Sequence, residues 1–81
     1  MTDVLLPAQA WQDVDAGTEA LVDAWLVREG DRVRAGQTIA AVVLVKTRFD
    51  IEAPADGVLD KILVPKDGTF KPGQPLARLT P

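Results

Sequence analysis

The sequence predicts an all-β protein: a flattened barrel or sandwich made of two small, mostly antiparallel sheets. Three observations predict this fold. Apolar segments of strand length alternate with turn residues, no helical period is sustained over ten residues, and the two halves of the chain repeat one another. With 81 residues, 47% of them hydrophobic, the chain has the size and composition of a single packed domain.

The expected elements follow the apolar segments in order. Residues 7–18, "PAQAWQDVDAGT", are loop-like, and Trp11 within them is expected to cap the barrel. Pro54 has no N–H for a sheet ladder and should close the strand that begins near Arg48. The glycines at strand ends are expected to supply positive φ in the turns: Gly30, Gly36, Gly57, Gly68 and Gly73. Strands are predicted near residues 3–6, 20–27, 32–33, 38–45, 48–53, 57–63, 69–70 and 75–80.

An internal repeat relates the two halves at an offset of 37 residues. Residues 19–42 align with residues 56–79. Each copy is a strand–turn–strand unit that needs a partner to bury its apolar face, so the copies should pack face to face about a pseudo-twofold axis. The same offset aligns the connector, residues 43–55, with residues 6–18, which lead in from the N-terminus. The pseudo-twofold should therefore place the connector and the chain termini at opposite ends of the domain. The identical pairs are Asp23/Asp60, Leu26/Leu63, Val27/Val64, Gly36/Gly73, Gln37/Gln74 and Ala40/Ala77.

Composition excludes several kinds of site. The chain has no cysteine and no histidine, which excludes disulfides, thiol chemistry, a zinc site and a histidine general base, and no metal is expected. A net charge of −3 without a basic stripe makes nucleic acid an unexpected partner. The longest apolar run, Ile39–Val45, is too short to span a membrane, and no signal peptide is visible, so a cytoplasmic protein without a membrane partner is expected. Asp13 and Asp15 are expected to be solvated loop charges.

One lysine stands at the crest of the connector. Val42–Val45 and Arg48–Ala53 are expected to form antiparallel arms, with Val45-Lys46-Thr47 as a tight turn at the tip. Taken alone, an exposed lysine on a turn is an ordinary solvent-exposed residue without a specific function. A lysine nucleophile requires burial or cationic neighbours, and a solvated tip with only Arg48 nearby does not favour one.

The surroundings of Lys46, "VKTRFDIEAPADG", resemble the attachment hairpin of biotinyl/lipoyl carrier domains. In that family the modified lysine is followed by proline after eight residues and by glycine after eleven, which here are Pro54 and Gly57. The resemblance covers nearly the whole chain, and the repeat is similar to the family's pseudo-symmetric barrel-sandwich hybrid. It implies that residues 1–81 form one carrier domain without an active site of its own. It also implies that Lys46, flanked on the turn by Val45 and Thr47, is the attachment residue.

The resemblance favours lipoate over biotin as the prosthetic group. The N-terminal half resembles the start of a 2-oxo acid dehydrogenase acyltransferase subunit, and the methionines that flank the lysine of biotinyl domains are replaced by Val45 and Thr47. It implies loading by a lipoyl protein ligase. It further implies transfer of acyl groups and electrons between a thiamine-dependent decarboxylase, an acyltransferase and a flavin dehydrogenase. A biotin carboxyl carrier loaded by a biotin protein ligase, and an unmodified lipoyl-like interaction module, remain open. An exposed apolar tip, Val43–Val45 with Phe49, is expected to face the modifying enzyme.

Overall fold

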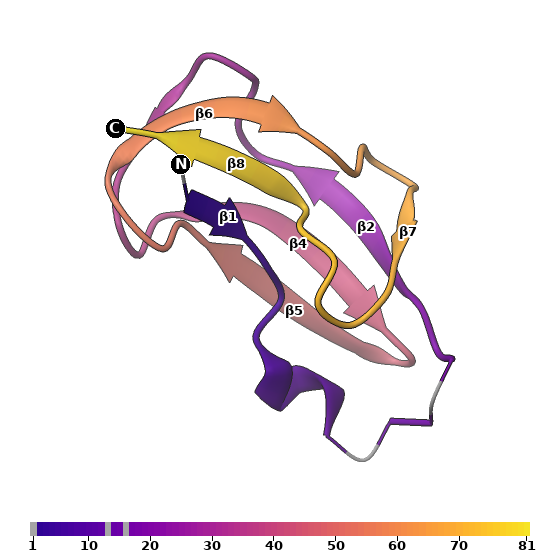
Figure 1. Cartoon of the computed structure of the whole chain (residues 1–81). Coiled ribbons are helices and arrows are strands. Elements are labelled where there is room, and N and C mark those ends of the chain that lie inside the picture. The colour runs from indigo at the N-terminus through magenta and orange to yellow at the C-terminus, as the bar shows by residue number, and fades with distance from the viewer. Residues whose placement is uncertain (1, 13, 16) are drawn as a thin grey trace.

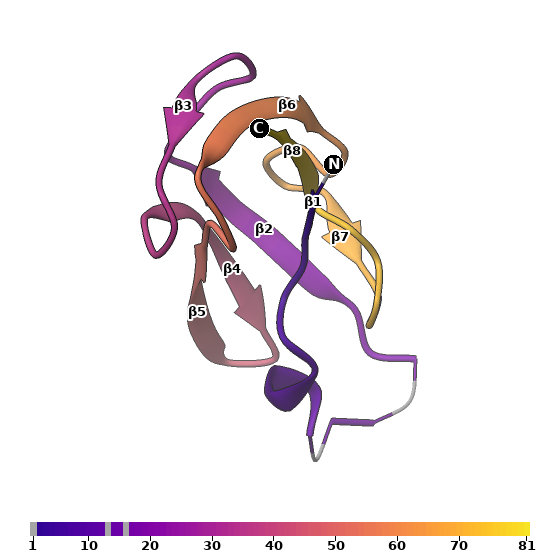
Figure 2. The same cartoon turned by 60° about the vertical axis from the view of Figure 1, so that its left-hand side comes forward.

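The computed structural model describes residues 2–12, 14–15 and 17–81, and shows two four-stranded antiparallel sheets packed against each other (Figures 1 and 2). The predicted all-β sandwich is confirmed. Within the described residues the helical structure is a single 3-10 turn, η1 (Ala8–Trp11), in the segment predicted as a loop. The first sheet has the order β1 (Thr2–Val4), β8 (Ala77–Thr80), β6 (Gly57–Ile62) and β3 (Arg32–Val33), and the second has the order β5 (Thr47–Glu52), β4 (Thr38–Leu44), β2 (Ala20–Trp25) and β7 (Thr69–Phe70).

The first and last strands are shorter than predicted. β1 ends at Val4, and β8 begins at Ala77 rather than at residue 75. Pro75 has no N–H to donate to a ladder, so regular pairing begins only after it. The chain is still held at this point, because the Leu76 N–H donates to the Val4 carbonyl over 2.7 Å.

The core lies between the two sheets and is apolar. Side chains alternate between buried and exposed along β8 and over most of β5, as a sheet with one solvated face requires. Among the described residues, no polar or charged residue is buried. The largest fully buried side chains come from both sheets and from the loops that close them: Phe70, Ile39, Ile51, Leu59, Leu76 and Leu79.

The internal repeat is present in the positions of the strands and of their β-bulges. β2 and β6 lie 37 residues apart, as do β3 and β7. The pairing of β2 with β4 shifts between Val22 and Ala24, and that of β6 with β8 shifts between Leu59 and Lys61. The residues inside these two bulges are Asp23 and Asp60, an identical pair of the repeat. A bulge leaves one residue out of the ladder and bends the strand, so both sheets curve at the same place.

The identical Gly-Gln pairs form the same turn in each half. Gly36 has φ of +83° and Gly73 has φ of +82°, a conformation that glycine adopts without steric cost. The side-chain amide oxygens of Gln37 and Gln74 accept hydrogen bonds from backbone N–H groups three residues earlier, over 3.0 and 3.1 Å. These residues recur because each turn needs a residue with positive φ, followed by a side chain that accepts a hydrogen bond from a backbone N–H of the turn.

The offset of 37 residues does not extend to the first strand, which corrects one expectation. β1 and β5 occupy equivalent edges of the two sheets, but residues 37 positions before β5 fall in η1 and the loop that follows it. Residues 6–18 are therefore not the counterpart of residues 43–55. They belong to a long connection between β1 and β2, where the second half has only the short connection between β5 and β6.

Gly57 serves a different purpose from the one expected of it. It is not among the residues with positive φ. A Cβ at this position would overlap the carbonyl oxygen of Thr80, so the glycine allows β6 and β8 to approach closely. Gly68 is similar, because a Cβ there would lie 2.9 Å from both the Pro65 carbonyl oxygen and a Val64 methyl group.

The chain ends and the β4–β5 hairpin lie at opposite ends of an elongated molecule that measures 35 × 21 × 17 Å (Figure 1). Thr2 pairs with Leu79, which brings the two ends of the chain together on one sheet. In both views the hairpin points away from them. In the described part of the chain, no helix is long and apolar enough to cross a membrane.

Candidate functional site

The β4–β5 hairpin presents Lys46 at its tip. Leu44 pairs with Thr47 as the last rung of the ladder, so Val45 and Lys46 form a two-residue loop. Lys46 and both of its sequence neighbours are exposed. Because the ladder below the loop continues down to the pair Thr38–Glu52, the lysine stands on a long, paired support.

Val45 adopts an unusual backbone conformation at this tip. Its φ is +59°, and of the two loop residues only Val45 has positive φ. A positive φ at the first position of a two-residue hairpin loop is a conformation that glycine, asparagine or aspartate normally provides. For a β-branched residue such a φ is a strained outlier that the surrounding structure must enforce. The position of Lys46 is therefore set by the hairpin ladder against the preference of its neighbour.

Replacing Val45 with glycine is expected to stabilise the domain. The left-handed conformation costs an L-residue about 1–2 kcal/mol, and glycine removes this cost. The greater freedom of glycine in the unfolded chain stabilises the unfolded state and so offsets part of the gain. The net gain should be about 0.5–1 kcal/mol in the free energy of unfolding, measured by urea titration. Val45→Ala retains the Cβ and should gain less. A Val45→Gly variant less stable than Val45→Ala would contradict the inferred strain.

The exposed apolar tip that the sequence predicted is confined to one residue. Val45 is 67% exposed, but Leu44 is buried, and Val43 and Phe49 are half-buried. Leu44 points into the core, and Phe49 packs against its edge. The apolar residues of the hairpin thus anchor it to the sandwich, and Val45 is the exception beside the lysine.

The 3-10 turn η1 and the residues after it cover the end of the core near the hairpin. Ala10, Trp11 and Val14 pack against the core cluster. Trp11 meets Phe70 edge to face, with ring centroids 5.9 Å apart and an interplanar angle of 86°, as expected of a residue that caps the barrel. Its Nε1 is buried without a hydrogen-bond partner. At the opposite end of β2, the indole N–H of Trp25 donates to the Val64 carbonyl over 2.8 Å.

The charged residues near the tip are solvated. Arg48 forms an ion pair with Asp23 over 3.5 Å, with both side chains largely exposed, so its contribution to stability is small. Asp15 is exposed, and Asp13 lies outside the described residues. Within the part of the chain that the structure describes, no group of three or more acidic side chains could hold a metal ion.

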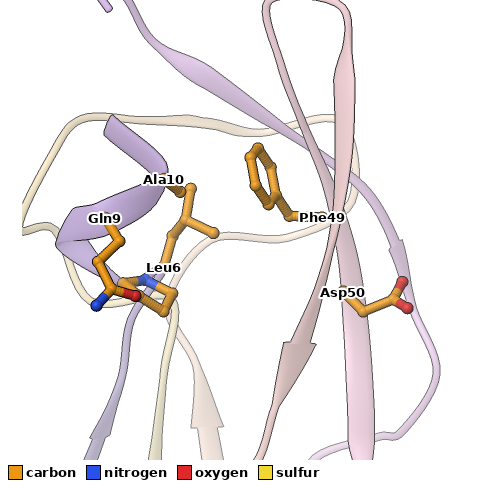
Figure 3. Close-up of a pocket in the computed structure, with 6 residues that line it drawn as sticks. Leu6, Gln9, Ala10, Phe49 and Asp50 are labelled. Carbon is orange, nitrogen blue, oxygen red and sulfur yellow. The ribbon is translucent and has the colours of Figure 1, made fainter. Parts of the chain in front are cut away.

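Two open hollows lie between the β4–β5 hairpin and the segment that contains η1. The larger, about 340 Å³, is lined by residues on both sides of Lys46 in the chain, and the smaller, about 240 Å³, lies farther along β5 (Figure 3). None of the described residues that line the larger hollow has a charged side chain. Asp13, which stands between the lining residues Gln12 and Val14 in the chain, lies outside the described residues. Neither hollow brings together an acid, a base and a nucleophile. The exposed Lys46 on its paired hairpin is typical of a class of protein that presents a side chain to other molecules.

The comparison with protein families identifies the class. Residues 13–79 match the family of biotin/lipoyl attachment domains, described as "Biotin-requiring enzyme", and the chain belongs to this family. Members carry lipoate or biotin covalently on a lysine. The predicted resemblance to biotinyl/lipoyl carrier domains is thus confirmed.

Curated relatives include both kinds of carrier. The acetyltransferase component of the pyruvate dehydrogenase complex of Rickettsia felis is 36% identical over 55 residues, which cover 68% of this chain and 13% of the relative. The acetyltransferase component of the acetoin cleaving system of Pseudomonas putida is 40% identical over 60 residues, covering 74% and 16%. The biotin carboxyl carrier protein of acetyl-CoA carboxylase of Streptococcus pyogenes is 38% identical over 53 residues, covering 65% and 32%. The chain thus spans less than a third of the length of each of these relatives.

A solved structure matches the fold over the whole chain. It is the lipoyl domain of the 2-oxoglutarate dehydrogenase complex from Azotobacter vinelandii, with a TM-score of 0.80. The superposition covers 100% of this chain and 98% of that domain, at 23% sequence identity. The shared architecture is therefore the lipoyl-domain fold.

Proposed function

We propose that this domain carries a lipoyl group in amide linkage on Lys46 and moves acyl groups and electrons between the active sites of a 2-oxo acid dehydrogenase-type complex. The observation that carries the proposal is an exposed lysine on the two-residue loop of the hairpin. Pro54 and Gly57 stand eight and eleven residues after it, the spacing of the attachment hairpin. The acetyltransferase relatives support lipoate as the group.

The residues around Lys46 fit a covalent group. Its amine stands at the tip of the loop, so a protein ligase can reach it, and the amide bond removes its ammonium charge. The β4–β5 ladder holds the attachment point. When bound, a lipoyl group supplies a dithiolane that accepts acyl groups and electrons, and the protein supplies its presentation.

The separation of the tip from the chain ends suits a carrier. A linker or neighbouring domain joined near Thr2 or Pro81 would hold the end of the molecule opposite Lys46. Tethering of this kind raises the effective concentration of the carried group at each partner site. The partners we propose are a lipoyl protein ligase, a thiamine-dependent decarboxylase, an acyltransferase and a flavin dehydrogenase.

A second candidate is a biotin carboxyl carrier, which the Streptococcus pyogenes relative favours. The same lysine would then carry biotin, whose ureido ring transfers a carboxylate between two active sites. The geometry of the hairpin serves both functions, because each needs only an exposed amine on a rigid support.

Intact-mass measurement of the protein purified from its native host tests the proposal. We expect the mass to be raised by one lipoyl group, because acylation consumes a single amine, with the modification on the peptide that contains Lys46. A biotinyl mass at Lys46 would establish the second candidate instead. An unmodified protein from cells whose other lipoyl and biotinyl proteins are fully loaded would contradict both carriers and favour an interaction module.

A further inference from the structure

We propose that the larger hollow beside the hairpin is a docking groove for the acyl chain on Lys46, so that the loaded arm alternates between this groove and solvent. The inference deepens the proposed function and rests on it only for the position of the arm. It concerns a binding site on the carrier itself, next to the attachment residue.

The position of the groove carries the first part of the argument. Val45 and Thr47, the residues on either side of Lys46, both line it, so the groove begins where the arm begins. A short tether gives the arm an effective concentration in the millimolar range at this site. A free ligand or a separate protein would need tight binding to displace the tethered arm from this groove. The full lining is Ala10, Gln12, Val14, Leu44, Val45, Thr47 and Phe49.

The second hollow extends the path along β5. Ala10 and Phe49 line both hollows, so the two are neighbours. Figure 3 shows the Phe49 ring and the Leu6 side chain between β5 and η1. From Thr47 to Asp50 the strand rises about 10 Å, at about 3.3 Å per residue. A linear chain attached at Lys46 and directed along β5 would meet both hollows in turn, which favours an extended acyl arm as the occupant.

The chemistry of the lining matches an acylated lysine and not a free one. The described residues that line the groove have apolar side chains, apart from two polar neutral residues, Gln12 and Thr47, and none of them is charged. A free Lys46 would have to bring its ammonium group out of water, and none of the described lining residues is an acidic partner for it. Acylation removes that charge and adds a run of methylene groups, which gain by leaving water. Loading the carrier therefore also makes the arm compatible with the groove.

The consequence is a two-position arm. In the docked position the carried chain is partly sheltered against β5 and η1, and in the free position it reaches a partner. A partner active site that binds the arm shifts the population toward the free position by its own affinity. Between partners the docked position shields the apolar chain from unspecific contacts.

The experiment uses a ligase-independent arm, so that its failure is distinguishable from failure of the proposed function. The chain has no cysteine, so the thiol of a Lys46→Cys variant is unique and can be alkylated with a neutral octyl chain. Matched arms are an oligoethylene glycol chain of the same length and an aminoethyl group, which restores a lysine-like charge. The readout is nuclear Overhauser contact between the arm and side chains, together with amide shifts.

We expect the octyl arm to contact Ala10, Val14 and Phe49, and the glycol and aminoethyl arms to perturb only residues next to position 46. Ala10→Asp places a charge in the groove and should lower the docked fraction about tenfold or more. Ala8→Asp makes the same substitution at an exposed position of η1 that lines neither hollow, and should leave the contacts unchanged. Amide spectra of both variants verify the fold.

Three results would overturn the proposal. The first is an octyl arm with no more contacts than the glycol arm. The second is a set of contacts on another face of the domain. The third is an equal loss of contacts in Ala8→Asp and Ala10→Asp, which would assign the effect to charge on η1 in general. If the groove instead binds a partner protein, the octyl arm of the isolated domain would make no more contacts than the glycol arm.

Discussion

Lys46→Arg is expected to abolish attachment of lipoate or biotin while the fold is retained. Arginine keeps the positive charge and approximate length, but its guanidinium offers no amine for the amide bond. Lys46 is exposed on the hairpin loop, so the substitution should change the free energy of unfolding by no more than about 0.5 kcal/mol. Incorporation of labelled lipoate or biotin in the presence of the matching ligase, followed by intact mass, measures the loss.

The matched control is Lys61→Arg on β6, an exposed lysine of the other sheet. It should be modified as fully as the unaltered protein. Label that persists in Lys46→Arg and maps to Lys61 or Lys66 would show that the attachment residue is wrongly assigned. Loss of label together with loss of native amide dispersion would show unfolding, and Lys46→Gln, which also lacks an amine, then provides a second variant for the same measurement.

Phe70→Ala is expected to have the largest effect on stability. Phe70 is 1% exposed and meets Trp11 edge to face, although its strand, β7, has only two residues. Truncation of a buried phenylalanine costs about 3–5 kcal/mol, because the lost transfer energy adds to that of the cavity. Small domains have total stabilities of roughly 5–15 kcal/mol, so this one change would remove a large share.

Urea titration of Phe70→Ala beside Thr69→Ala measures this loss. Thr69 precedes Phe70 on the same strand but is exposed, so its truncation should change the free energy of unfolding by only about 0.5 kcal/mol. Phe70→Leu, which keeps part of the volume, should fall between the two. Equal stabilities of the two alanine variants would show that the contact between β7 and the core carries little energy. Because Phe70 supports Trp11, we also expect the tryptophan fluorescence of Phe70→Ala to change.

The features that the sequence alone determined are local or periodic. The strands were predictable because apolar runs of strand length stop at glycine, proline and acidic turn residues. The repeat predicted two similar sheets, since identical residues such as Asp23/Asp60 and Gln37/Gln74 mark the same bulges and turns. A tight turn containing Lys46 followed from the short distance between two strand signals, but Thr47, predicted as part of the tip, is the first residue of β5 and pairs with Leu44.

The tertiary structure alone decided how these elements meet. Whether Phe49 faces solvent or the core depends on what covers that end of the sandwich, and the cover is η1, about 40 residues earlier in the chain. Gly57 is required because the Thr80 carbonyl approaches it closely. The residues that form turns do not predict this contact, because Thr80 is distant in the sequence. The positive φ of Val45 runs against the preference of its own residue type and is imposed by the pairing of β4 with β5. The groove beside Lys46 likewise has walls from two distant segments, and a pattern along one segment carries no information about which other segment will pack against it.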